Sequence, residues 1–249
     1  MVISIIALLI AILLPALGAA RQSARKMQNS TQLRGIHQAL VVFAQSNKNW
    51  YPGIASDGTT MTVAEVNDTG TFTGRGGTSN GRNSSGIFAV ALNQDVFTPE
   101  YLINPVDGEA TPVSETTDTD LDFEGGGDPH NFSYANLYWQ ENATGPQESG
   151  RVAEWKESFN SQAIVLSDRL IGSGATKSSL WTELGSGKWE GTITNNDNST
   201  NFENTDEGYT TQYGNATVED DSLFVTDGTV GGAAAPNTNG TRTDARMRH

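Results

Sequence analysis

The side chains that could do chemistry in this sequence are mostly acidic, and their clearest spacing suits a hard cation. One series alternates along the chain: Asp118, Asp120, Asp122 and Glu124. Carboxylates at alternate positions can converge on a calcium ion, but an EF-hand loop also needs Gly at its sixth position and Glu at its twelfth. This chain has Phe123 and Pro129 there. The pattern therefore favours a solvated acidic loop over a calcium site.

Other catalytic or cofactor-binding patterns are incomplete. The sequence has no Cys, and His37 and His130 do not form a spaced pair, so the parts of a nucleophile–base site or a zinc site are missing. No carboxylate spacing supports a hydrolase. The Gly-rich segment 74–77 lacks the preceding strand and following Lys-Ser/Thr of a phosphate loop. We therefore assign no catalytic, cofactor-binding or metal-binding residue and do not expect an enzyme.

Charge is divided unevenly along the 249 residues. Residues 1–56 carry five basic and no acidic side chains, and residues 57–249 carry ten basic and 29 acidic ones, a net charge of −19. Such an acidic surface repels phosphate backbones, so we expect no nucleic-acid partner. Many Gly, Asn, Thr and Ser residues follow Gly53 and favour a β-rich domain with long loops. The five Trp residues are expected to pack in and around its core.

The most informative element is the uncharged segment Met1–Ala20. About 20 apolar residues can span a hydrocarbon core, whereas the apolar region of a secretory signal is about 7–15 residues long. Pro15 is expected to kink or loosen this helix, and Arg21 marks its edge. A signal peptide cleaved after Gly18-Ala19-Ala20 is the alternative. The expected membrane and assembly residues are Val2, Ile3, Ile6, Leu9, Ile10, Leu13, Leu14, Pro15, Leu17 and Arg21.

Helical periodicity continues beyond the apolar segment. Met27 begins a series of apolar residues with spacings of three, four and seven, which predicts one helix from about Ile3 to Gln45. Asn47, Asn49, Pro52 and Gly53 should end it. The residues expected to pack against the head are Leu33, Ile36, Leu40 and Phe43.

The rest of the chain predicts a small antiparallel sheet, and so an α+β fold. Ser84 and Ser85 should cap a short helix, and 96–103 is a buried connection. We expect strands at 61–66, at 131–139, and at 163–166 in the sheet centre. Residues 192–206 are polar and predict a mobile loop. Leu223–Val230 predicts a strand pair turning at Asp227-Gly228, and 231–249 predicts a disordered tail.

The N-terminal segment resembles the helix of type IV pilins and type II secretion pseudopilins. Residues 2–17, followed by Ala19-Ala20-Arg21, carry this resemblance. Shorter blocks are similar to a bacterial pseudopilin-like subfamily with a C-terminal Asp-Gly turn: residues 25–29, 51–53, 102–105, 163–169 and 223–230. The resemblance is strong over the first 53 residues and patchy beyond.

Some positions depart from the subfamily. It usually has Cys where this chain has Asn29 and Asn104, and His where this chain has Thr217. A basic leader ending in Gly, followed by Phe, apolar residues and a Glu, does not precede Met1. We therefore expect the sequence to begin inside the mature helix. Loops rich in Lys and Arg beside a membrane span tend to stay in the cytoplasm, so Arg21, Arg25 and Lys26 alone would keep the C-terminal part inside the cell. A basic leader before Met1 would instead place the N-terminus inside and the C-terminal part outside.

The resemblance implies a pilin-like fold and a structural function. A membrane-spanning and spine helix (1–50) would pack on a β-rich head (51–230), with the disordered tail at 231–249. The chain would be a single-pass, methylated protein of the bacterial inner membrane with a periplasmic or extracellular head. Its partners would be the membrane, copies of itself and the secretion or pilus machinery. Some pseudopilins bind calcium, which makes Asp220, Asp221 and Asp227 a second candidate calcium site. A secreted binding protein with a cleaved signal peptide is the alternative.

Overall fold

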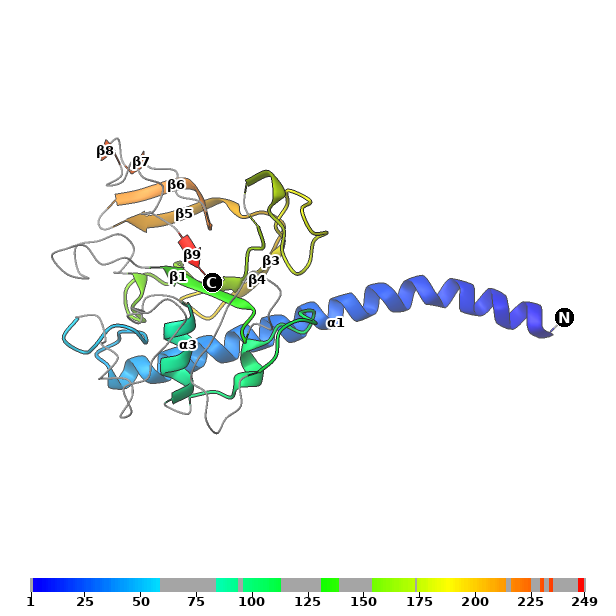
Figure 1. The fold of residues 1–249 in the computed structure, drawn as a ribbon, viewed down its shortest axis with the longest axis horizontal. Helices are drawn as coiled ribbons and strands as arrows, with labels where there is room; N and C mark the ends of the chain where they lie inside the picture. The colour runs from blue at the N-terminus through cyan, green and yellow to red at the C-terminus, as the bar shows by residue number, and fades with distance from the viewer. Residues whose placement is uncertain are drawn as a thin grey trace.

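The computed structural model has one long N-terminal helix whose C-terminal half packs against a small antiparallel sheet (Figure 1). The fold is α+β, as the sequence predicts. The structure describes residues 2–58, 84–93, 96–112, 131–138, 154–172, 174–213, 216–224, 229–230, 233–234 and 246–248. The expected strand at 61–66 lies outside these ranges.

Helix α1 covers Val2–Ser46 without interruption, which confirms the predicted continuous helix. At about 1.5 Å per residue it is roughly 68 Å long. It continues through Pro15, and Figure 1 shows a gentle curve along the half that leaves the head. At its end Lys48 and Asn49 adopt positive φ angles of 50° and 69°. The Asn49 N–H donates to the Ala44 carbonyl at 2.8 Å, which closes the last turn.

The main sheet has five antiparallel strands in the order β4-β3-β2-β1-β9. Strand β2, Ile164–Asp168, lies in the middle, as predicted. Tyr134 of β1 pairs with Asp168 of β2, and Ser167 of β2 pairs with Ile193 of β3. The other strands are β1 (Tyr134–Tyr138), β3 (Gly191–Asn195), β4 (Thr200–Glu203) and β9 (Arg246–Arg248).

Shorter elements complete the head. Strands β5 (Glu207–Tyr213) and β6 (Ala216–Ser222) form a separate hairpin. The expected short helix is α3, Ser84–Asn93, and the expected buried connection contains the 3-10 helix η1, Pro99–Leu102. A further 3-10 helix, η4, covers Gly174–Thr176. The Ser84 hydroxyl accepts a hydrogen bond from the Asn136 N–H at 3.2 Å, so it connects α3 to β1.

The core lies between the C-terminal half of α1 and the sheet. Leu33, Ile36, Leu40 and Phe43 are all buried there, as their spacing predicts. Met27 is instead 73% exposed, and the polar Asn29 is buried one turn before Leu33. Trp155 and Trp189 are the largest fully buried side chains, so both contribute to packing.

The prediction of a mobile polar loop at 192–206 is wrong. This segment contains most of β3 and all of β4, which are joined by a tight turn with Asn198 at a φ of 64°. Thr192 and Thr194 are buried in the sheet. Threonine is β-branched and suits a strand. The buried Thr192 hydroxyl also accepts a hydrogen bond from Asn29 Nδ2 at 2.9 Å. The polar composition therefore concealed a hairpin at one edge of the main sheet.

The C-terminal segments also differ from the prediction. Leu223 and Phe224 are buried but lie in a bend, so the strand pair expected from Leu223 is wrong at its start. The expected turn residues Asp227 and Gly228 lie outside the described residues. Beyond them β7 (Thr229–Val230) pairs with β8 (Ala233–Ala234). Strands β8 and β9 fall within the segment expected to be disordered, because backbone pairing in a strand does not require apolar periodicity.

Candidate functional site

The N-terminal half of α1 is an exposed apolar surface. It projects away from the head (Figure 1). From Val2 to Leu17 its large apolar side chains are between 50% and 83% exposed. No residue in the most apolar 18-residue stretch of the helix is buried. The helix is long and apolar enough to cross a membrane. An apolar surface of this size requires a lipid or protein environment.

The carboxylate of Asp168 joins α1 to the sheet. It is fully buried at the end of β2 and accepts hydrogen bonds from four residues. Asn29 Nδ2 lies 3.0 Å from Oδ1 and 2.8 Å from Oδ2, and Asn104 Nδ2 lies 2.8 Å from Oδ1. Trp181 Nε1 and the Thr192 N–H donate to Oδ2 at 2.8 and 2.7 Å.

The surroundings of Asp168 set its protonation. Burial raises its pKa to about 6, while the hydrogen bonds from Thr192, Asn29, Trp181 and Asn104 act in the opposite direction because they favour the charged form. At neutral pH the group is therefore a carboxylate, which matches a site built from donors. With both oxygens occupied and no exposed surface, this carboxylate serves to hold α1, the loop at 181 and β3 together.

Asn29 extends this polar centre. Its Oδ1 accepts a hydrogen bond from the Tyr134 hydroxyl at 2.8 Å, and its Nδ2 also lies 2.9 Å from Thr192 Oγ1. One side chain of α1 therefore contacts β1, β2 and β3. Burial raises the pKa of Tyr134, so its hydroxyl keeps the proton that it donates.

His37 forms a second polar connection between α1 and the head. Its Nε2 lies 3.1 Å from the Tyr51 hydroxyl and its Nδ1 lies 3.2 Å from Asn198 Oδ1. The Tyr51 hydroxyl in turn donates to Asn196 Oδ1. Burial lowers the pKa of His37, which keeps the ring neutral. These partners orient the ring rather than activate a nucleophile.

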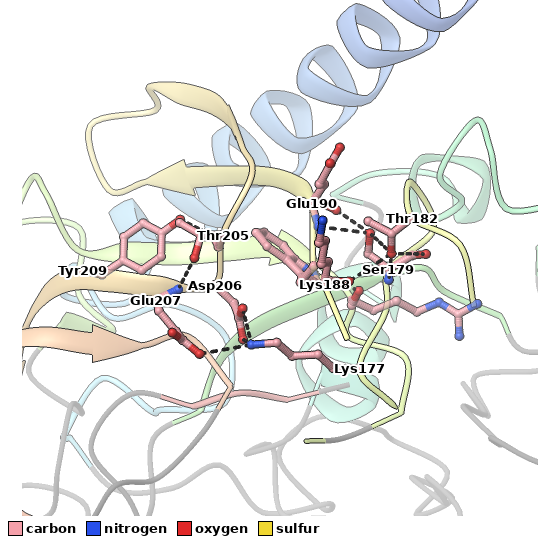
Figure 2. Close-up of polar contacts among 11 residues, drawn as sticks. Lys177, Ser179, Thr182, Lys188, Glu190, Thr205, Asp206, Glu207 and Tyr209 are labelled. Atoms are coloured by element: carbon pink, nitrogen blue, oxygen red, sulfur yellow. Dashed lines mark hydrogen bonds and ion pairs between the residues drawn. The ribbon is translucent and has the colours of Figure 1, made fainter. Parts of the chain in front are cut away.

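The segment that carries Trp181 is fixed by several polar contacts (Figure 2). The Thr182 hydroxyl accepts from the Ser179 N–H at 2.7 Å and donates to the Lys188 carbonyl at 3.1 Å, while the Ser179 hydroxyl donates to the Glu190 carbonyl. Nearby, Lys177 Nζ lies 2.7 Å from Asp206 and 3.1 Å from Glu207. This segment is therefore held firmly against the sheet.

An open groove of about 570 Å³ lies where α1 leaves the head. Its helix side consists of Gly18, Arg21, Gln22 and Arg25, and its head side of Val106, Leu180 and Trp181. Close to it, Lys26 Nζ lies 3.4 Å from the centroid of the Phe202 ring, which packs edge-to-face on Trp181. Two arginines and an aromatic ring thus meet at the boundary between the apolar helix and the head.

Several candidates from the sequence lie outside the described residues. These are the acidic series at 118–124, the Gly-rich segment 74–77, His130, Asp227 and Gly228. Asp220 is exposed in the β5–β6 hairpin. Within the described ranges no group of three or more His, Cys, Asp or Glu side chains could hold a metal ion.

Sequence reasoning missed the Asp168 centre and the groove. Two signals for the Asp168 centre were available in the sequence. One is the polar residue Asn29 on the buried face of α1, and the other is an acidic residue just after the apolar run 163–166. The groove had only the basic residues after Ala20 as a signal. Comparison of the chain with protein-family models, with curated proteins and with solved structures finds no match.

Proposed function

We propose that this chain is a structural, pilin-like subunit, anchored in the bacterial inner membrane by the first half of α1, of a type II secretion or type IV pilus-like assembly. The observation that carries the proposal is the division of α1 into an exposed apolar half and a half packed on the sheet. The resemblance of residues 1–53 to pilins and pseudopilins supports the same interpretation. The pilin-like fold is part of this proposal.

The mechanism is physical. The apolar half of α1 resides in the bilayer until assembly, when helices from several copies bury their side chains against one another. Gly18, Ala19 and Ala20 permit close approach of neighbouring helices at the edge of the apolar region. The acidic heads remain in water on the periplasmic or outer side, where they meet the assembly machinery or exported substrates.

The buried hydrogen bonds between α1 and the head support a role in which movement of the helix also moves the head. Asn29 and His37 each tie α1 to several strands or turns of the head through buried hydrogen bonds. A subunit whose helix is pulled from a membrane into a filament must carry its head with it. Connections of this kind make helix and head move as one body.

The test is fractionation of the intact chain expressed in a bacterium. We expect it in the membrane fraction, resistant to a high-salt wash and released by detergent, or in sedimenting filaments. Leu9→Arg combined with Leu13→Arg should release it, since each charge at the centre of a span costs about 2.5–3.5 kcal/mol. The matched control, Ser23→Arg with Gln28→Arg, adds the same charge at exposed positions outside the apolar segment and should remain membrane-bound.

Two results would overturn the proposal. One is an intact chain that is a soluble monomer without detergent. The other is a mature N-terminus after Ala20, measured by mass spectrometry, which would support the alternative of a secreted protein with a cleaved signal peptide.

A further inference from the structure

We propose that the groove between α1 and the head binds the phosphate group of an anionic membrane lipid, with phosphatidylglycerol as the simplest example. This inference rests on the membrane anchor proposed above and adds a ligand to it. The site consists of Arg21, Arg25 and Gln22 on the helix and Trp181 with Leu180 on the head.

The groove lies at the depth of lipid headgroups. The exposed apolar run ends at Leu17, and residues 2–20 of a helix cover about 28 Å, close to the thickness of a hydrocarbon core of about 30 Å. Residues 21–25 add about 7.5 Å beyond Ala20, which corresponds to the headgroup layer of roughly 5–8 Å on each side of the core. When the apolar half spans a bilayer, the groove is therefore in contact with headgroups.

The chemistry of the groove suits a phosphate that carries apolar chains. Arg21 and Arg25 are one helical turn apart, and guanidinium groups bind phosphate oxygens through paired hydrogen bonds. No acidic side chain among the described residues forms an ion pair with either of them. Gln22 adds a neutral donor, while Val106 and Leu180 provide apolar surface for the upper part of an acyl chain.

The head side of the groove is fixed before any ligand arrives. Trp181 Nε1 donates to Asp168 at 2.8 Å. The hydrogen bonds of Ser179 and Thr182, shown in Figure 2, fix the backbone on either side of Leu180 and Trp181. Trp is also the side chain that favours the membrane interface. A rigid wall reduces the entropy lost on binding.

The net charge of the head explains why a lipid-binding site would be useful in this chain. Residues 57–249 have a net charge of −19, so an anionic bilayer repels the head. Arg21 and Arg25 are the basic residues nearest the apolar segment and offset that repulsion where the head meets the surface. An anionic lipid in the groove would thereby set the depth of the head relative to the membrane.

The experiment measures lipid binding to the full chain in detergent by native mass spectrometry. Phosphatidylglycerol, phosphatidylcholine and inorganic phosphate are titrated separately. We expect phosphatidylglycerol to bind tightest, and Arg21→Gln with Arg25→Gln to weaken it by about tenfold or more, since each basic residue near an anionic lipid contributes roughly a factor of five. Arg34→Gln with Lys48→Gln removes the same charge at exposed positions in the head region and should leave binding unchanged.

A third variant tests the groove rather than its charge. A Cβ atom added at Gly18 meets no atom within 4 Å, and Gly18 lines the groove, so Gly18→Phe places an aromatic side chain in open space there. It should weaken phosphatidylglycerol binding while α1 and the net charge are kept.

Three results would overturn the proposal: equal binding of phosphatidylcholine and phosphatidylglycerol, equal losses in both double variants, or displacement of the lipid by millimolar inorganic phosphate. The last would assign the groove to free phosphate. None of these three results would reject the proposed membrane anchor, because fractionation of the same variants tests the anchor separately. A chain that does not enter membranes at all would instead reject the anchor.

Discussion

Asn29 on α1 and Asn104 after η1 donate hydrogen bonds to the same oxygen, Oδ1 of Asp168, at 3.0 and 2.8 Å. Both side chains are buried. Under the pilin-like assignment proposed above, these are the two positions where the similar subfamily usually carries Cys. Here a shared carboxylate, rather than a covalent bond, connects the helix to the chain at 104.

The amide of Asn29 should contribute strongly to stability. Asn29→Ala removes donors from a buried carboxylate and leaves the Tyr134 hydroxyl without its 2.8 Å acceptor. We expect the free energy of unfolding to fall by about 3 kcal/mol or more, measured by chemical denaturation of the chain lacking residues 1–20. Gln28→Ala, at the adjacent exposed position, should change it by less than about 0.5 kcal/mol. Equal effects of the two substitutions would show that the buried network contributes nothing.

The proximity of Asn29 and Asn104 predicts an engineered crosslink. The chain has no Cys, so Asn29→Cys with Asn104→Cys introduces a single pair of thiols. Both side chains donate to one oxygen of Asp168, so the two thiols would face the same small space beside that carboxylate. We expect oxidation to form an intramolecular disulfide, seen as faster migration in non-reducing electrophoresis. Gln28→Cys with Asn104→Cys should not form it, because residue 28 faces solvent. Absence of the bond in the first pair would contradict the arrangement.

The raised pKa of Asp168 predicts a pH dependence with a definite sign. The unfolded chain ionises this group at its ordinary pKa of 3.8, and the folded protein at about 6. Between these values the folded state binds the Asp168 proton more tightly than the unfolded chain does. The contribution of protonated Asp168 to the free energy of unfolding is therefore complete below about pH 3.8 and is lost as the pH rises through about 6. A shift of this size corresponds to roughly 3 kcal/mol.

The measurement is the difference in unfolding free energy between the wild-type chain and Asp168→Asn across this pH range. It should decrease as the pH rises. His37 acts with the opposite sign: its pKa is lowered by burial, so its contribution is lost as the pH falls below 6.5. Because both proteins contain His37, its effect cancels in the difference. A difference that grows with pH would contradict the assigned shift.

Leu40 tests the packed face of α1. It is fully buried in the core, so Leu40→Asp places an unpaired charge there and should lower the unfolding free energy by at least about 3 kcal/mol. Thermal unfolding of the chain lacking residues 1–20, followed by circular dichroism, measures the effect. Val42→Asp is the control, because Val42 lies on the same helix and is 61% exposed. If Leu40→Asp left the transition unchanged, another face of the helix would be packed.

Gly191 tests the close packing beside Asp168. A Cβ atom there would lie 2.5 Å from Trp189 Cζ2 and 2.9 Å from Asp168 Cβ. Gly191→Ala should therefore destabilise the head by about 1–3 kcal/mol in chemical denaturation. Gly108→Ala meets no atom within 4 Å and should be nearly neutral. A neutral Gly191→Ala would show that β3 is less tightly packed against Asp168 and Trp189.

The long helix and the central strand follow from local sequence patterns. The apolar run to Ala20 and the periodic series to Phe43 predict α1 because helix formation depends on neighbours three and four residues apart. Leu33, Ile36, Leu40 and Phe43 share one face for the same reason. The apolar run at 163–166 predicts β2 in the sheet centre, since a strand buried on both faces needs apolar side chains.

The polar residues of the interior, in contrast, are selected by contacts between distant parts of the chain. Thr192 and Thr194 are polar in sequence, yet pairing with neighbouring strands buries them in β3. Asp168 collects donors from residues 29, 104, 181 and 192, and no local pattern connects positions so far apart. The groove likewise needs Trp181 beside Arg21. A buried carboxylate is tolerated only where several donors converge, and the folded chain alone brings them together.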